Sequence, residues 1–158
     1  MKKILIIFIF CSSVYANTDV GTNSGKKIPR FVSLKSSEAN LRIGPSLDYP
    51  IILQYVVKNI PLKVIDEFND WRKIEDWNNN SGWMHLSLLS SSRFGIIKRD
   101  INNIYKKPNG NIIGIIGKDN IIKLKKCERN WCLFSIKKLK GWLKKDSVWG
   151  VFNNENFD

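Results

Sequence analysis

Side chains that could act as nucleophiles, bases or metal ligands are few in this chain of 158 residues. It has one histidine, His85, and three cysteines, Cys11, Cys127 and Cys132. A structural zinc site takes four protein ligands, and a catalytic histidine needs a nucleophile beside it. Cys127 and Cys132 are close together, but with the distant His85 they supply fewer than four metal ligands, and neither thiol is next to the histidine in the sequence. The sequence therefore predicts no metal site, no cofactor and no catalytic residue.

Paired carboxylates are the other route to catalysis. Glu75 and Asp76 are adjacent in a predicted strand, where neighbouring side chains point to opposite faces. They therefore cannot flank one glycosidic bond. The sequence at residues 108–111, Pro-Asn-Gly-Asn, is typical of a turn rather than a phosphate-binding loop. One enzymatic alternative is kept, ranked second after the binding functions considered below: a small cell-wall hydrolase that uses His85 and a carboxylate.

The start of the chain has the pattern of a secretory signal peptide. Residues 1–3 are basic, residues 4–10 are apolar, and Val14 and Ala16 are small residues before a cleavage point. A membrane-spanning helix needs about 20 apolar residues, more than this run supplies. We expect residues 1–16 to be removed, which gives an exported protein, periplasmic or associated with the cell envelope, without a transmembrane segment after cleavage.

Export changes what is expected of the cysteines, because Cys11 leaves with the signal peptide. In an oxidising compartment two nearby cysteines favour a disulfide. Four residues separate Cys127 from Cys132, which suits a hairpin whose flanking positions face each other. A metal site would lack ligands, and a redox pair would normally be Cys-x-x-Cys. The sequence predicts a Cys127–Cys132 disulfide.

The remainder of the chain has the pattern of a small β protein. Polar and small residues dominate residues 17–30, which predicts a flexible linker. Short apolar stretches separated by turn residues follow, and they predict strands at residues 31–34, 51–57, 62–65, 71–74 and 82–84.

The second half repeats the first. Trp71 corresponds to Trp131, and Gly82-Trp83 corresponds to Gly141-Trp142, at nearly the same offset. The sequence therefore predicts a tandem duplication, with domains at residues 31–92 and 93–152 and a C-terminal tail at residues 153–158. Five strands in such a short unit predict a small, strongly bent barrel.

The motifs of the first unit resemble the bacterial SH3 (SH3b) domain family, of the type found in exported alphaproteobacterial proteins. They are Asn40-Leu41-Arg42-x-Gly44-Pro45-Ser46, Trp71-Arg72-Lys73-Ile74 and Gly82-Trp83-Met84. The second unit is similar to a second repeat of that type, through Gly141-Trp142-Leu143 and Val148-Trp149-Gly150-Val151. It has Tyr105-Lys106-Lys107-Pro108 in place of the Arg-x-Gly-Pro element. The resemblance implies an all-β fold of two tandem, small, SH3-like five-stranded barrels, and a binding module rather than an enzyme.

Aromatic residues are the main candidates for ligand binding. Tyr49 lies in a proline-containing loop and Trp77 at a turn, where we expect both to be exposed unless they belong to the periphery of the core. Exposed aromatic side chains can stack on sugar rings or proline, as in SH3-type grooves. With Arg42 and Tyr55 they form the predicted ligand site. Trp71 and Trp131 recur at the same place in each repeat, so we expect them to be structural residues of the two cores rather than ligand contacts.

Charge differs between the two units. Residues 31–92 contain six basic and seven acidic side chains, whereas residues 93–158 contain fifteen basic and six acidic ones. The second unit should attract polyanions, and export argues against nucleic acid. We therefore expect an exported, non-catalytic binding module for peptidoglycan or another anionic envelope polymer, with shape recognition in the first barrel and electrostatic attachment in the second. The first alternative is an adaptor that recruits a periplasmic protein through an SH3-like groove.

Overall fold

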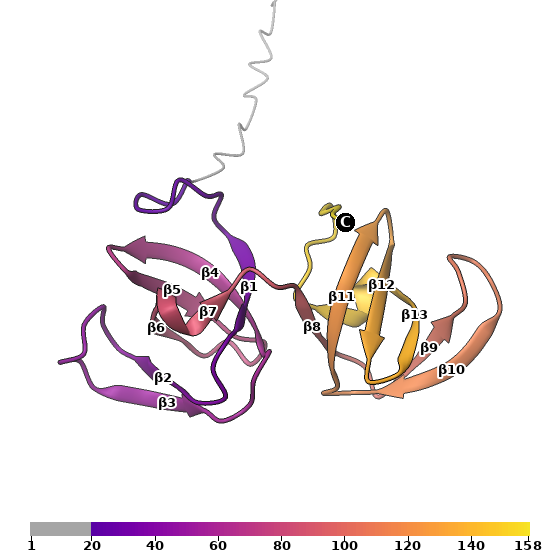
Figure 1. Cartoon of the computed structure of the whole chain (residues 1–158), viewed down its shortest axis with the longest axis horizontal. Helices are drawn as coiled ribbons and strands as arrows, with labels where there is room; N and C mark the ends of the chain where they lie inside the picture. Colours follow the sequence, from indigo (N-terminus) through magenta and orange to yellow (C-terminus); the bar gives the residue numbers. More distant parts are fainter. Residues whose placement is uncertain (1–19) are drawn as a thin grey trace, which may run out of the picture.

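The computed structural model describes residues 20–158, which form two antiparallel β-sheets side by side, one for each repeat (Figure 1). This confirms the all-β fold with two tandem SH3-like units. The signal peptide predicted at residues 1–16 lies outside the described residues. Within residues 20–158, no helix is long and apolar enough to cross a membrane.

Each sheet has seven strands, two more than the sequence predicts for the first unit. The first sheet contains β1 (Arg30–Leu34), β2 (Ala39–Arg42), β3 (Ile51–Tyr55), β4 (Pro61–Phe68), β5 (Trp71–Glu75), β6 (Ser81–His85) and β7 (Leu89–Ser90), with the 3-10 turn η1 (Leu86–Leu88) before β7. Its strand order is β3-β2-β6-β5-β4-β1-β7. The additional strands are the four-residue β2, which belongs to the Asn40-Leu41-Arg42 motif, and the two-residue β7.

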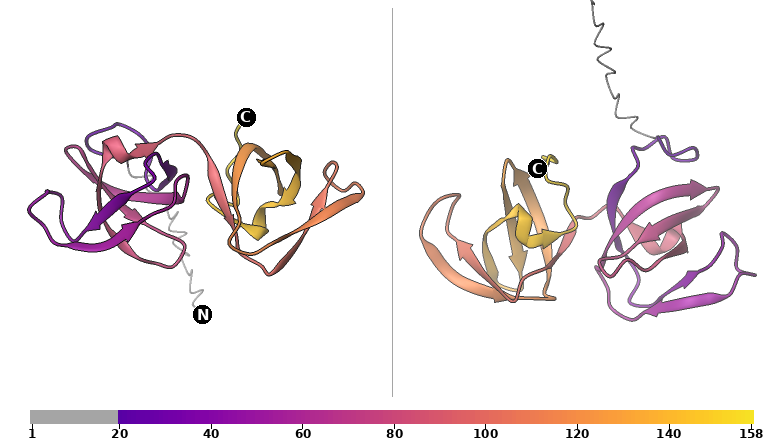
Figure 2. Two further views of the ribbon diagram at one scale, coloured as in Figure 1. Left: turned by 60° about the horizontal axis from the view of Figure 1, so that its bottom comes forward. Right: turned by 180° about the vertical axis from the view of Figure 1, so that it is seen from behind.

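The second sheet repeats this arrangement. It contains β8 (Phe94–Ile97), β9 (Ile101–Tyr105), β10 (Ile112–Gly117), β11 (Ile121–Glu128), β12 (Trp131–Ile136), β13 (Leu139–Lys144) and β14 (Val148–Trp149), with η2 (Lys145–Ser147) before β14. Its order is β10-β9-β13-β12-β11-β8-β14. The hairpins β2–β3 and β9–β10 project at opposite ends of the molecule, as Figure 2 shows from two further sides.

Asparagine residues make the tight turns that the sequence predicts. Asn69 joins β4 to β5 with a φ angle of 47°, and Asn79 joins β5 to β6 with a φ angle of 64°. Positive φ angles are uncommon for residues other than glycine, and asparagine adopts them more readily than most. The turns therefore close hairpins between strands whose alternating residues face the barrel interior.

Mostly aliphatic side chains, together with Met84 and Phe134 and without a tryptophan, fill the two barrels. The first core includes Leu34, Leu41, Leu62, Val64, Ile74 and Met84, and the second includes Ile97, Ile104, Ile122, Leu124, Phe134 and Leu143. Trp71 is half-buried and lies outside the first core, which corrects the expectation that it is a core residue. Trp131 is buried, but it packs edge-on against Tyr105 at 4.9 Å between ring centroids rather than within the second core.

Residues 20–29 contact the first barrel, although their composition predicts a flexible linker. The side chain of Glu67 on β4 is fully buried, and its carboxylate accepts hydrogen bonds from the backbone N–H and the hydroxyl of Ser24 at 2.8 and 2.7 Å. Arg30 and Arg72 pair with the same carboxylate at 2.7 and 3.3 Å. Burial alone would raise the pKa of Glu67, but the hydrogen bonds from Ser24 and Arg30 and the charge of Arg30 lower it to about 2.

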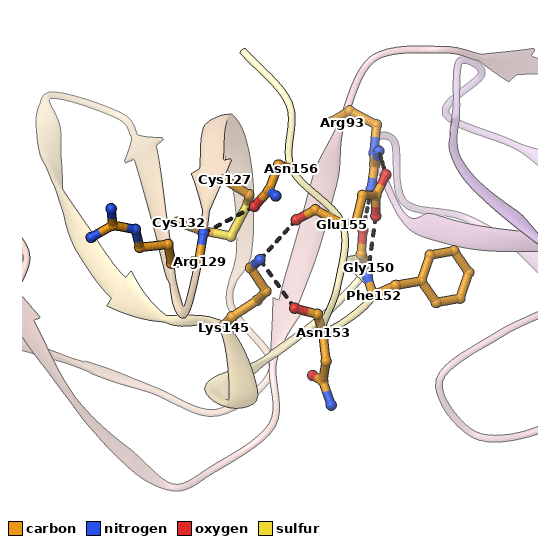
Figure 3. The surroundings of a disulfide bond; sticks show 10 residues. All are labelled: Arg93, Cys127, Arg129, Cys132, Lys145, Gly150, Phe152, Asn153, Glu155 and Asn156. Atoms are coloured by element: carbon orange, nitrogen blue, oxygen red, sulfur yellow. Dashed lines mark hydrogen bonds and ion pairs between the residues drawn. A yellow bond between two sulfur atoms is a disulfide. The ribbon is translucent and has the colours of Figure 1, made fainter.

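The disulfide joins Cys127 on β11 to Cys132 on β12, which lie directly opposite each other, as predicted (Figure 3). On its other side, Cys127 exchanges two backbone hydrogen bonds with Phe157, at 2.8 and 2.9 Å. Lys145 donates from Nζ to the carbonyl oxygens of Asn153 and Glu155, at 3.3 and 2.7 Å. The C-terminal tail is therefore tied to the hairpin that carries the disulfide.

Replacing both Cys127 and Cys132 by serine should lower the free energy of unfolding by about 2 kcal/mol, because the disulfide closes a short loop. Urea denaturation of the protein comprising residues 17–158 measures this difference. Thiol labelling of the unreduced, unfolded protein should find no free thiol. Two labelled cysteines would contradict the disulfide.

An aromatic cluster joins the two barrels. Phe31 on β1 packs against Trp149 on β14 at 5.0 Å between ring centroids and against Phe152 at 4.6 Å. The Arg93 guanidinium lies 5.9 Å from the centre of the Phe31 ring and 4.4 Å from that of Phe157. Arg93 also forms an ion pair with Glu155 (Figure 3). The barrels are therefore connected by side-chain packing as well as by the chain between β7 and β8.

Candidate ligand-binding groove

A groove of about 280 Å³ opens on the first barrel, where the β2–β3 hairpin meets the start of β5 and the end of β6. We call it the first groove. Its apolar lining comes from Ala39, Leu47, Trp71 and Leu88, and its polar lining from Glu38, Asn40, Arg42, Gln54 and His85. The first groove therefore combines one large aromatic side chain with hydrogen-bonding side chains, one of which is acidic and one basic.

Strand pairing places Trp71 and His85 together. Trp71 begins β5 directly after the Asn69 turn, and it pairs with His85 at the end of β6. Their rings meet edge-to-face at 5.5 Å between centroids. The sequence predicted Trp71 to be a core residue and gave His85 no part in the ligand site. Trp71 and His85 are the pair at the open end of the β5–β6 hairpin. The position of Trp71 at the start of its predicted strand was the available signal that its side chain lies at the edge of the barrel.

His85 is held by the 3-10 turn that follows it. Its Nδ1 accepts a hydrogen bond from the backbone N–H of Ser87 at 3.3 Å and lies 2.8 Å from the hydroxyl oxygen of Ser87. A ring nitrogen that accepts from a backbone N–H carries no hydrogen, which leaves the hydrogen on Nε2. His85 can therefore donate one hydrogen bond to a ligand in the groove, while its Nδ1 caps η1.

Arg42 shapes the loop that borders the groove. Its Nη1 donates to the carbonyl oxygens of Leu47 and Tyr49, at 2.9 and 2.7 Å. The Tyr49 ring covers Gly44, where an added Cβ would lie 2.6 Å from that ring. The Tyr49 side chain is 46% exposed. Arg42 therefore lines the groove and fixes the loop, and Tyr49 lies in that loop beside the groove.

Tyr55 and Trp77, the other two predicted ligand residues, lie elsewhere. Tyr55 is buried and donates from its hydroxyl to Asp76 at 3.0 Å; burial and the Asp76 charge raise the pKa of Tyr55. Trp77 packs against the first core and lines a separate cleft between the barrels, with Ile96 and Ile121 of the second barrel. The structure thus brings Arg42 and Tyr49 together, and it separates Tyr55 and Trp77 from them.

The carboxylates considered for catalysis are also separated. Glu75 forms an ion pair with Lys63 on the neighbouring strand, whereas Asp76 is buried and accepts hydrogen bonds from the backbone N–H groups of Asn78 and Asn80, both at 2.9 Å. These contacts place one acid on the surface of the sheet and the other inside a turn.

Comparison with known proteins identifies the class of protein to which this all-β chain and its groove belong. A family model described as Bacterial SH3 domain matches residues 35–91 and 98–150, so the chain belongs to that family, with two copies in tandem. Domains of this family are typically non-catalytic modules that bind cell walls. No curated protein matches the chain.

The solved structures that are similar to the chain include the following three. NlpC2 from Trichomonas vaginalis is 11% identical, with a TM-score of 0.36, over 77% of this chain and 48% of that one. NlpC1 from the same organism is 11% identical, with a TM-score of 0.37, over 82% and 48%. An NlpC/P60 family protein from Bacillus cereus is 13% identical, with a TM-score of 0.35, over 76% and 56%. The chain spans about half the length of these proteins.

Proposed function

We propose that the protein is an exported, non-catalytic module that attaches to peptidoglycan through the first groove. The observation that carries the proposal is the lining of this groove, which combines Trp71 with the hydrogen-bonding side chains of Asn40, Arg42, Gln54 and His85. Binding sites commonly combine an apolar surface with a few polar groups that fix orientation. Peptidoglycan offers sugar rings for the aromatic surface, and hydroxyl and amide groups for the polar side chains.

Two further features support this proposal. The pattern of residues 1–16 favours export, and the disulfide suits an oxidising compartment. The basic second barrel would add attraction to an anionic wall or envelope polymer, as a second contribution to attachment. Such attraction between exposed charges is screened over about 8 Å at physiological salt, whereas contact with Trp71 depends less on salt.

Sedimentation with purified sacculi tests the proposal. The protein comprising residues 17–158 should pellet with sacculi, and Trp71→Ala should weaken binding about 30-fold, the effect of about 2 kcal/mol typical of an aromatic hot spot. Gln54→Ala, a smaller change in the groove, should weaken binding less and preserve folding. Trp77→Ala is the matched control, because Trp77 is also half-buried but lies outside the groove.

Three results would contradict the proposal. A protein that stays in solution with sacculi but captures a periplasmic protein would instead be an adaptor. Loss of binding in Trp77→Ala alone would place the site between the barrels. Release of soluble fragments from labelled sacculi, abolished by His85→Ala, would indicate a hydrolase.

A further inference from the structure

The second barrel has a groove that shares two aligned positions with the first groove, at Trp131 and Lys144, whereas the positions aligned with Glu38, Ala39, Asn40 and Arg42 line a separate hollow of the second barrel. β12 pairs Trp131 with Lys144 as β5 pairs Trp71 with His85. β9 pairs Tyr105 with Trp142 as β2 pairs Arg42 with Trp83. The second groove measures about 470 Å³, and it is lined by Trp131, Lys144, Lys145 and three asparagines. The duplication has therefore kept the tryptophan and changed the side chains around it.

The charged side chains of the second groove differ from those of the first groove. Lys144 replaces His85, and Lys145 replaces Leu86, the first residue of the 3-10 turn. The charged lining of the second groove is therefore two ammonium groups and the carboxylate of Asp146, whereas that of the first groove is Glu38 and Arg42.

Of the two lysines in the second groove, Lys145 has the more unusual environment, because it is only 3% exposed. Its Nζ donates to the backbone carbonyls of Asn153 and Glu155. An ammonium group has three donors, so among the described residues one remains for a ligand in the groove. The Lys145 charge also interacts with the Glu155 carboxylate, but that carboxylate is paired with Arg93, so the Lys145 ammonium can still attract an anion in the groove.

The remaining lining suits a peptide. Asn109, Asn130 and Asn153 line the groove, and each amide side chain can both donate to and accept from a peptide group. Asp146 is the one carboxylate in this lining, and it pairs with Arg99 at 2.9 Å. Its charge is therefore already matched by a cation outside the groove.

We propose that the second groove binds a free carboxylate of an acidic peptide, with Lys144 and Lys145 contacting the carboxylate and the asparagines contacting the peptide backbone. The inference deepens the proposed function, on which it rests for the source of the ligand, because wall polymers carry short peptides with free carboxylates. It differs from general attraction to a basic surface, since it assigns the effect to one groove.

Titration with fluorescently labelled penta-glutamate tests this assignment, and penta-glutamine is the uncharged control. In the protein comprising residues 17–158, Lys144→Gln should weaken penta-glutamate binding about tenfold, the loss of one charge-assisted hydrogen bond. Lys138→Gln is the matched control, because it removes the same charge from an exposed turn at the other end of β13. Lys144→Arg should restore most of the affinity, and penta-glutamate should shift the indole N–H resonance of Trp131.

Equal losses in Lys144→Gln and Lys138→Gln would overturn the proposal, since they would show attraction to the surface as a whole. Equal affinity for penta-glutamine would overturn it as well. The titration contains no cell wall, so failure of this test is distinguishable from failure of the sacculus experiment.

Discussion

Phe31→Ala is expected to lower the free energy of unfolding by about 3 kcal/mol, the lower end of the range for a buried phenylalanine. Phe31 is 8% exposed, and two of its aromatic neighbours, Trp149 and Phe152, belong to the other barrel. The substitution should therefore remove packing between the barrels as well as within the first one. Urea denaturation followed by tryptophan fluorescence measures the stability, and small-angle scattering measures whether the barrels separate.

Phe68→Ala provides the matched control for this prediction. Phe68 lies on β4 of the same barrel but is 53% exposed, so its truncation should cost less than about 1 kcal/mol. A double-mutant cycle of Phe31→Ala with Phe152→Ala should show coupling, because the two rings are in contact. Additive effects, or a Phe31→Ala protein as stable as Phe68→Ala, would contradict a stabilising contact between the barrels.

Glu67→Gln is expected to destabilise the protein by about 3 kcal/mol at neutral pH. The pKa of the Glu67 carboxyl falls from 4.5 to about 2 on folding. A lowered pKa contributes stability that is fully present above pH 4.5 and is lost as the pH falls toward 2. The difference between wild type and variant, measured by urea denaturation, should therefore be largest at neutral pH and should shrink below pH 4.5.

Glu75→Gln is the control for Glu67, because its ion pair with Lys63 joins side chains that are 28% and 24% exposed. Such surface pairs contribute about 0–1 kcal/mol. Glu67→Gln should also increase hydrogen exchange at the backbone N–H of Ser24, which bonds to this carboxylate. A destabilisation that is the same at pH 7 and pH 2.5, or no larger than that of Glu75→Gln, would contradict the prediction.

Most of what the sequence predicted correctly depends on residues that are close together in the chain. Asparagine turns and alternating residues define hairpins locally, so the strands at β1, β4 and β5 could be identified from the sequence. The Cys127–Cys132 disulfide was predictable for the same reason, since a hairpin brings residues five apart into register. The duplication was visible because the tryptophans recur at nearly the same offset.

The first groove could be predicted only in part. The family motif indicated Arg42 and the loop that holds Tyr49, but the groove also needs Trp71 and His85, which come from β5 and β6. From the sequence, the aromatic side chains of Tyr55 and Trp77 suggested ligand binding as strongly as that of Tyr49 did. Tyrosine and tryptophan occur both inside proteins and at their surfaces, and only the packed barrel places Tyr55 inside and Trp77 between the two units.

Long-range contacts account for the remaining differences. Polar composition indicated a linker before β1, yet Ser24 reaches Glu67, forty-three residues further along the chain. The Phe31 cluster likewise joins β1 to β14. Hydrophobic periodicity determines which face of a strand is buried, and turn residues determine where the chain reverses. Which strands and side chains become neighbours depends on the packing of the whole chain, and that arrangement is decided only in the tertiary structure.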